Sequence, residues 1–201
     1  MRFPGPTHRN IYVRSERAGQ RVMESVKRFI ASKLKLKVNE AKSAVGKPQE
    51  RKFLGFSFYM SKKGPGRRIA PKALDKFKER VREITLGSRG RSMKQTIEEL
   101  SRYLKGWIAY FGFFQTPSVL TNLDSWIRRR IRCAFWQQWK TSRKRHAELV
   151  KRGVNLGTAK NMAGSNQGSW HLSLSKAMSI ALSNAELASL GLPSLANLAR
   201  A

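Results

Sequence analysis

Acidic residues are scarce in this 201-residue sequence, which has 12 Asp and Glu against 41 Lys and Arg. Asp75 and Asp124 are its only aspartates, and the glutamates are scattered along the chain. Nucleotidyl transfer by two metal ions needs clustered carboxylates that hold the ions about 3.5–4 Å apart. No such cluster is visible in the sequence, so we expect neither a catalytic site nor a metal or other cofactor in this chain on its own.

Other motifs that carry chemistry are missing as well. A single cysteine, Cys133, excludes an internal disulfide and a zinc finger of the CxxC type. The three histidines, His8, His146 and His171, do not have the spacing of metal ligands. No glycine-rich loop followed by Lys-Ser or Lys-Thr is present to hold a phosphate. The sequence therefore favours binding over catalysis.

Long apolar runs are also absent, and none is long enough to span a bilayer. The first ten residues, MRFPGPTHRN, do not have the pattern of a signal peptide. We therefore expect a cytoplasmic protein that has no membrane partner.

What the sequence has in excess is positive charge, with a formal net charge of +29. Such an excess repels itself in a folded chain and points to a polyanionic partner. Because the chain is 40% hydrophobic, it can bury a core and is not a disordered basic tail. The basic residues extend along the chain to about residue 160, which fits an RNA or DNA track better than an anionic membrane surface.

The pattern of apolar residues predicts an α+β fold that is mainly α. Residues 1–10 are expected to be irregular, and residues 11–70 to form a small α+β piece. Within that piece, residues 11–13 are predicted to end a strand, and Ser15 to cap a helix over 16–33. Alternating Leu34, Leu36 and Val38 predict a half-buried strand. Residues 51–70 predict two strands around the Gly-Pro-Gly turn at 64–66.

From Pro71 onward the pattern is helical. Residues 71–153 are predicted to contain four helices: one from Pro71 to near Gly87, one capped by Ser92 and running to about Phe111, one starting near 117–118, and one over 141–153 that closes on Gly153. The tail, residues 154–201, is poor in charge and rich in Ser, Ala, Leu and Asn, so we expect short, packed helices there.

The third of these helices contains the stretch LDSWIRRRIRCAFWQQWK, residues 123–140, which divides into two faces at 100° per residue. The apolar face holds Leu123, Trp126, Ile127, Ile131, Ala134 and Phe135. The other face holds Arg128, Arg129, Arg132, Trp136 and Trp139. This basic and aromatic face is either a nucleic-acid surface or a solvated face whose tryptophans cover a neighbouring element.

The helix over 92–111 divides in a similar way. Its apolar stripe consists of Ile97, Leu100, Leu104, Trp107 and Phe111, so Trp107 is predicted to be a core residue. Lys94, Arg102 and Lys105 lie opposite. The preceding linker GSRGRS carries Arg89 and Arg91, which either contact phosphates or belong to an ordinary solvated loop.

Several of these segments resemble one family. RSMKQTIEELSRYLKGWIAYFG (91–112), residues 123–140 and GSWHLSLSKAMSIALSNAELASLGLPSL (168–195) resemble the maturase-specific region, also called thumb and domain X, of bacterial group II intron-encoded reverse transcriptases. Upstream, LKLKVNEAKS (34–43) is similar to a palm segment and RKFLGFSF (51–58) to the primer-grip hairpin. The resemblance covers residues 11–198. It implies a remnant of the reverse transcriptase palm over 11–70, the thumb and maturase-specific domain over 71–153, and a helical extension of that region over 154–201.

The sequence departs from the family before the segment NIYVRSERAG. In the family, that place carries Tyr-Ala-Asp-Asp, whose aspartates hold the catalytic metals, whereas PGPTHR stands here. The chain therefore resembles the C-terminal part of such an enzyme. Polymerisation is not expected of it alone, although the complete parent enzyme, an RNA-directed DNA polymerase, would use Mg²⁺.

By this resemblance, the chain would grip group II intron RNA and assist its splicing, as a product of a mobile element, and the thumb would also contact template–primer duplex. Arg128, Arg129 and Arg132 would hold phosphates, while Trp136 or Trp139 could stack on an unpaired base. The full set of candidate RNA-binding residues is Arg89, Arg91, Lys94, Arg102, Lys105, Arg128, Arg129, Arg132, Trp136, Trp139 and Lys140. Two alternatives to an RNA-binding maturase-type fragment stay open. One is the C-terminal half of a split polymerase with a separate fingers and palm polypeptide, and the other is a decayed remnant.

Overall fold

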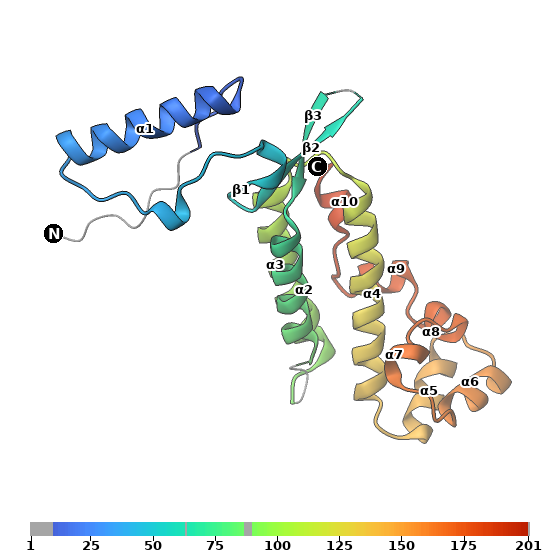
Figure 1. Cartoon of the computed structure of the whole chain (residues 1–201). Coiled ribbons are helices and arrows are strands. Elements are labelled where there is room, and N and C mark those ends of the chain that lie inside the picture. The colour runs from blue at the N-terminus through green and yellow to red at the C-terminus, as the bar shows by residue number, and fades with distance from the viewer. Residues whose placement is uncertain (1–9, 63, 87–89, 201) are drawn as a thin grey trace. The chain divides into compact units, whose positions relative to one another are not determined.

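The computed structural model describes residues 10–62, 64–86 and 90–200 (Figure 1). The fold is α+β and mainly α, as predicted. The chain divides between Ala70 and Pro71 into two compact units, here called the N-terminal and the C-terminal unit. Among the described residues, no helix is long and apolar enough to cross a membrane.

The N-terminal unit contains one long helix and one small sheet. Its described elements are α1 (Glu16–Lys33), the short 3₁₀ turns η1 (Glu40–Lys42) and η2 (Pro48–Glu50), and the strands β1 (Lys52–Phe53), β2 (Phe56–Ser61) and β3 (Gly64–Ile69). The strands pair antiparallel in the order β1-β2-β3. Ser15 caps α1 as predicted, because its hydroxyl accepts a hydrogen bond from the Ala18 amide at 3.2 Å.

Two predicted strands do not form. Residues 11–13 and 34–38 have no strand structure, and Leu34 and Leu36 are more than half exposed. A strand needs a neighbouring strand to pair its backbone groups, and among the described residues the sheet comprises β1, β2 and β3 only. Apolar alternation predicts which face of a strand would be buried, but it does not supply the partner.

The hairpin β2–β3 forms, but its turn lies elsewhere than predicted. Ser61 pairs with Gly64, so the Gly-Pro-Gly segment at 64–66 belongs to β3 and the connection comes just before it. Gly66 is buried beneath the Tyr59 ring, where a Cβ would come within 2.5 Å of Tyr59 Cζ. The second glycine therefore permits this close cross-strand approach, and it does not make the turn.

The C-terminal unit is helical in its described residues. Four longer helices come first: α2 (Pro71–Leu86), α3 (Met93–Phe111), α4 (Ser118–Gln138) and α5 (Ser142–Lys151). Five short ones follow: α6 (Leu156–Ala163), α7 (Ser169–Leu172), α8 (Lys176–Ala181), α9 (Asn184–Ser189) and α10 (Leu195–Leu198). The four predicted helices and the short helices of the tail are confirmed.

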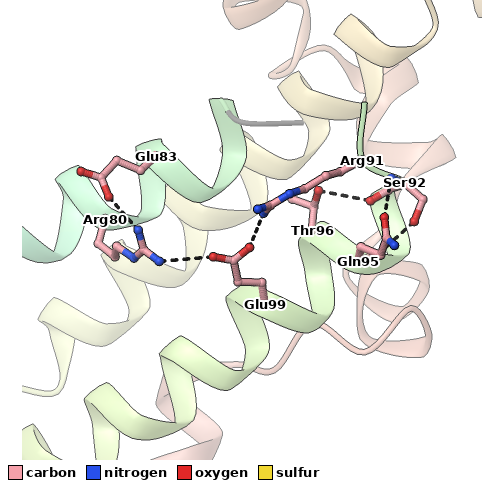
Figure 2. Close-up of polar contacts among 7 residues, drawn as sticks. All are labelled: Arg80, Glu83, Arg91, Ser92, Gln95, Thr96 and Glu99. Atoms are coloured by element: carbon pink, nitrogen blue, oxygen red, sulfur yellow. Dashed lines mark hydrogen bonds and ion pairs between the residues drawn. The ribbon is translucent and has the colours of Figure 1, made fainter. Parts of the chain in front are cut away.

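Local signals set these helix ends. Ser92 and Gln95 form a reciprocal capping box at the start of α3, with each side chain bonded to the other residue's backbone amide (Figure 2). Thr141 caps α5 by accepting from the Lys144 amide at 3.2 Å. Gly153 follows α5 at φ +82°, a conformation that glycine adopts without the cost of a side chain. These caps explain why the boundaries could be predicted.

The core of this unit lies among α2, α3 and α4. It is made of aliphatic side chains with an aromatic cluster, in which the Phe77 and Trp107 ring centroids lie 4.4 Å apart. Its most buried members are Phe77, Val81, Ile97, Leu100, Leu104, Ile127 and Ile131. Trp107 is buried, which confirms its predicted core position. Helix α4 also packs against α7 and α10, and so it joins the first helices to the tail (Figure 1).

Candidate nucleic-acid interface

A groove of about 660 Å³ lies between α3, α4 and the segment that carries α9 and α10. Lys105 of α3 and Arg128 of α4 line it, together with polar side chains such as Ser101, Asn184 and Asn197. A second hollow of about 300 Å³ shares Ser101 and Lys105 with it and adds Glu98 and Arg102. The structure therefore brings three predicted residues, Arg102, Lys105 and Arg128, to two adjoining hollows, which are together called the depression below.

One wall of this groove is fixed by a buried carboxylate. Asp124 accepts hydrogen bonds from the backbone amides of Leu195 at 2.8 Å and Ala196 at 3.1 Å, and from the Ser194 hydroxyl at 2.6 Å. Negative charge is favourable at the N-terminal end of a helix, where amides are unpaired. The carboxylate is therefore engaged by the start of α10 and holds this segment against α4.

Arg128 and Arg132 are one helical turn apart but have different surroundings. Arg128 is half-buried and donates to the Ser125 hydroxyl at 3.3 Å. Arg132 donates from Nε to the Leu182 carbonyl at 3.0 Å and from Nη2 to Asn184 Oδ1 at 3.4 Å. Burial, and then the nearby Arg128 charge, lower the pKa of the Arg132 guanidinium. Arg132 thus anchors the end of α8 and orients Asn184, while Arg128 lines the groove.

Arg129, predicted beside them, faces another part of the surface. Its guanidinium carbon lies 3.8 Å from the centroid of the Trp170 ring, and its Nη2 donates to the Trp170 carbonyl at 3.0 Å. Arg129 therefore does not line the groove. The helical-wheel pattern had grouped it with Arg128 and Arg132, but the structure separates the three.

Arg91 has a carboxylate partner in the protein, and its side chain is 51% exposed. It forms an ion pair with Glu99, and Glu99 also accepts from Arg80 of α2 at 3.3 Å, while Arg80 donates to Glu83 at 2.9 Å (Figure 2). This chain of charges connects α2 to the start of α3. The phosphate contact of Arg91 stays a prediction. The related prediction for Arg89 lies outside the described residues. Lys94 and Lys140 are exposed but do not line the groove.

The two tryptophans predicted to stack on bases are buried. Trp136 is 1% exposed and Trp139 is 4% exposed, so neither offers a face to a nucleotide. Arg145 lies 4.7 Å from the Trp136 ring centroid and Arg152 lies 5.2 Å from that of Trp139. The interpretation as RNA-stacking residues is wrong, because the second face of α4 is covered by the helices that follow it. The alternative, that these tryptophans cover a neighbouring element, is the correct one.

The sequence did not predict the role of Arg130. Its Nε and Nη2 donate to the Thr85 hydroxyl at 3.1 and 2.8 Å, which connects α4 to the end of α2. Burial lowers the pKa of this guanidinium. No local pattern could have found the pair, because the two residues are 45 positions apart. The contact between Arg129 and Trp170 could not be predicted for the same reason, because these residues are 41 positions apart.

Within the described ranges, no group of three or more His, Cys, Asp or Glu side chains is close enough to hold a metal ion. Cys133 is buried in α4 and lies 3.4 Å from the Ser169 hydroxyl. Apolar side chains such as Leu187 and Leu192 also line the groove, and the basic residues Lys105 and Arg128 lie among them.

Residues 74–153 match the family model described as the group II intron, maturase-specific domain. This segment runs from within α2 to the glycine that closes α5, and it supplies Arg102, Lys105 and Arg128. Residues 74–153 are therefore similar to a group II intron maturase-specific domain, and this match supports a maturase role in intron splicing. A comparison of the chain with curated proteins gave no match.

Proposed function

We propose that this chain binds structured group II intron RNA through the groove and assists the folding that precedes splicing. The observation that supports this proposal most is the meeting of Lys105, Arg128 and Arg102 at the depression, within the matched segment. The formal charge of +29 supplies long-range attraction for any polyanion. In addition to this general attraction, the groove holds cationic side chains in a fixed arrangement.

The lining of the groove suits RNA chemistry. Lys105 and Arg128 would contact phosphates, which position a nucleic acid without reading its sequence. Ser101, Asn184 and Asn197 offer neutral donors and acceptors beside them. A 2′-hydroxyl both donates and accepts, and proteins use contacts to it to distinguish RNA from DNA. Helical RNA presents these groups together with phosphates across its shallow minor groove, so its shape can be recognised.

We also propose that the chain does not polymerise nucleotides by itself and works without a cofactor of its own. The complete parent enzyme would use Mg²⁺, held by carboxylates that the resemblance places before the segment NIYVRSERAG. The proposed contribution of this chain is recognition of the RNA.

The test is the affinity of the purified chain for a folded group II intron RNA and for an unrelated RNA duplex of equal length, each across a salt series. Phosphate-driven binding falls steeply with salt whatever the sequence, so the ratio of the two affinities is informative. We expect a ratio well above ten that persists at high salt. Equal affinities that fall together would mean charge alone, and would favour a decayed remnant.

A second candidate function has an observation of its own in the N-terminal unit. Apolar side chains on and after α1 are exposed there, among them Phe29 at 56%, Leu34 and Leu36. Such a surface is typical of a protein interface. We propose as the alternative that a separate fingers and palm polypeptide covers it, giving a split polymerase whose thumb contacts template–primer duplex. Co-expression with such a polypeptide should then yield a stable complex that extends a primer, and Phe29→Asp should prevent its assembly.

A further inference from the structure

A second basic surface lies outside the groove, where arginines and tryptophans from three helices meet. It consists of Arg82 of α2, Trp126, Arg129 and Arg130 of α4, and Trp170 of α7, and is here called the Arg–Trp strip. The guanidinium of Arg82 lies 5.7 Å from the Trp126 ring centroid. Those of Arg129 and Arg130 lie 3.8 and 5.7 Å from the Trp170 ring centroid. Cations and aromatic rings therefore share one surface.

The strip and the groove occupy different sides of α4. Residues advance by about 100° each around a helix, which puts Trp126 and Arg128 about 200° apart. Trp126, Arg129 and Arg130 share one side, next to α2 and α7, because Arg82 and Trp170 contact them there. Arg128 lies on the side that faces the groove. The two surfaces can therefore be altered separately.

The positive charge of the strip is not neutralised by the protein. Among the described residues, the ion pairs involve other cations, and Arg82, Arg129 and Arg130 have no carboxylate partner in them. Like charges on one surface repel one another, and a bound anion would relieve that repulsion. Arg82 is exposed and Trp170 is 36% exposed, so solvent reaches both ends of the strip.

We propose that the Arg–Trp strip binds unpaired nucleotides of an RNA, with a base stacked on the face of the Trp170 ring opposite Arg129 and the flanking phosphates held by Arg82 and Arg129. Every base has a flat π-face, so stacking on an aromatic side chain is tolerant of sequence. Bases inside a duplex already stack on one another and cannot use the Trp170 ring, which makes a single strand the fitting partner. Arginine is suited to both contacts, because it pairs with phosphates and lies flat on aromatic rings. This inference goes beyond the groove and does not require the RNA to be an intron.

The experiment measures binding of the full chain to a 12-nucleotide oligouridine and to an RNA hairpin duplex containing the same number of phosphates. Trp170→Ala should weaken oligouridine binding by about tenfold, within the range found when one stacked base is lost. Its effect on the duplex should be less than about twofold. Trp170→Phe, which keeps an aromatic face, should weaken oligouridine binding less than Trp170→Ala. Phe113→Ala is the matched control, because Phe113 is 70% exposed and lies outside the strip.

A second variant keeps the test decisive if Trp170→Ala disturbs the packing of α7. Arg82 is exposed, so its replacement should not disturb the fold. Arg82→Gln should lower the slope of log affinity against log salt for oligouridine by roughly 0.7, the value of one phosphate contact on a single strand. Arg143→Gln, which removes an equal charge from the exposed surface of α5 outside the strip, should leave oligouridine affinity nearly unchanged. Equal losses for oligouridine and duplex in folded Trp170→Ala, or an unchanged salt dependence in folded Arg82→Gln, would overturn the proposal. Either result would leave the proposed function of the groove standing.

Discussion

Asp124 of α4 accepts a hydrogen bond at 2.8 Å from the backbone amide of Leu195, which lies 71 residues further along the chain. The carboxylate is buried, and its other bonds go to the Ala196 amide and the Ser194 hydroxyl. A buried charge is stable only when its hydrogen-bonding capacity is filled. One side chain thus holds in place the segment that carries α10 and lines the groove.

Replacing Asp124 should destabilise the C-terminal unit. Asp124→Ala leaves two backbone amides and a hydroxyl without their acceptor, and we expect a loss of about 2 kcal/mol in the free energy of unfolding. Asp124→Asn should lose less, because its amide oxygen still accepts. Urea unfolding followed by circular dichroism measures both. Asp75→Ala is the control, since Asp75 is exposed on α2; equal stability of the Asp75 and Asp124 variants would contradict the capping role.

Arg128 and Lys105 should carry part of the salt dependence of RNA binding. Each contact to a phosphate contributes roughly 0.7–0.9 to the slope of log affinity against log salt. Arg128→Gln and Lys105→Gln should therefore each lower the magnitude of that slope by up to one such unit, with a fall in affinity of several-fold at moderate salt. The measurement is a fluorescence titration of intron RNA. Arg143→Gln removes an equal charge from the exposed surface of α5, away from the groove. If Arg143→Gln changes the slope as much as Arg128→Gln does, the groove contributes no more to RNA binding than the rest of the basic surface.

Arg132, one turn from Arg128, should behave as a structural residue. Arg132→Gln removes the bond to the Leu182 carbonyl and releases Asn184, so we expect a loss of about 1–2 kcal/mol in unfolding free energy. For the folded variant, the slope of log RNA affinity against log salt should stay near that of wild type. Comparing unfolding and binding in the same buffer separates the two effects. A normal melting curve with a reduced slope would instead assign Arg132 to phosphate binding.

The helices could be predicted from the sequence because their determinants are local. Ser15, Ser92 and Gly153 each act within a few residues of their own position, and apolar spacing within 92–111 identified the buried stripe. The predicted strands over 11–13 and 34–38 are wrong. A strand forms only beside another strand, and the alternation of apolar residues does not show which segment that would be.

The candidate site was predicted less well, for a related reason. A helical wheel gives the relative directions of side chains, but not the number of sides that the rest of the protein covers. Helix α4 is covered by α2, α7 and α10, so Trp136 and Trp139 are buried although they lie away from the first apolar stripe. Trp170 and Thr85 are more than 40 positions from their arginine partners, a separation that local patterns do not reach.

Glu148 should make stability depend on pH in the acid range. Burial by itself raises the pKa of this carboxyl, but hydrogen bonds from Arg152 and Lys144 outweigh it, and the pKa lies below its ordinary value in the folded chain. The unfolded chain then binds the proton more tightly. The contribution is therefore fully present above about pH 4.3, the ordinary glutamate value, and is lost as the pH falls through the lower folded value.

The stability difference between wild type and Glu148→Gln should follow that course. Unfolding free energies at several pH values below about 6 measure it, and the wild-type advantage should shrink toward acid. A difference that does not change with pH would show that the bonds from Arg152 and Lys144 contribute no net stabilisation of the charged form.

Trp136 offers a direct comparison of the two interpretations of the basic, aromatic face of α4. As a core residue that is 1% exposed, with Arg145 over its ring at 4.7 Å, it should tolerate a smaller aromatic side chain at a cost of about 1–3 kcal/mol. Folded Trp136→Phe should bind intron RNA and oligouridine as wild type does, because no face of the ring reaches the solvent. Urea unfolding and a titration on the same preparation give both quantities. Unchanged stability together with weaker RNA binding would reverse the assignment, since it would mean that the ring turns outward to meet a base when RNA is bound.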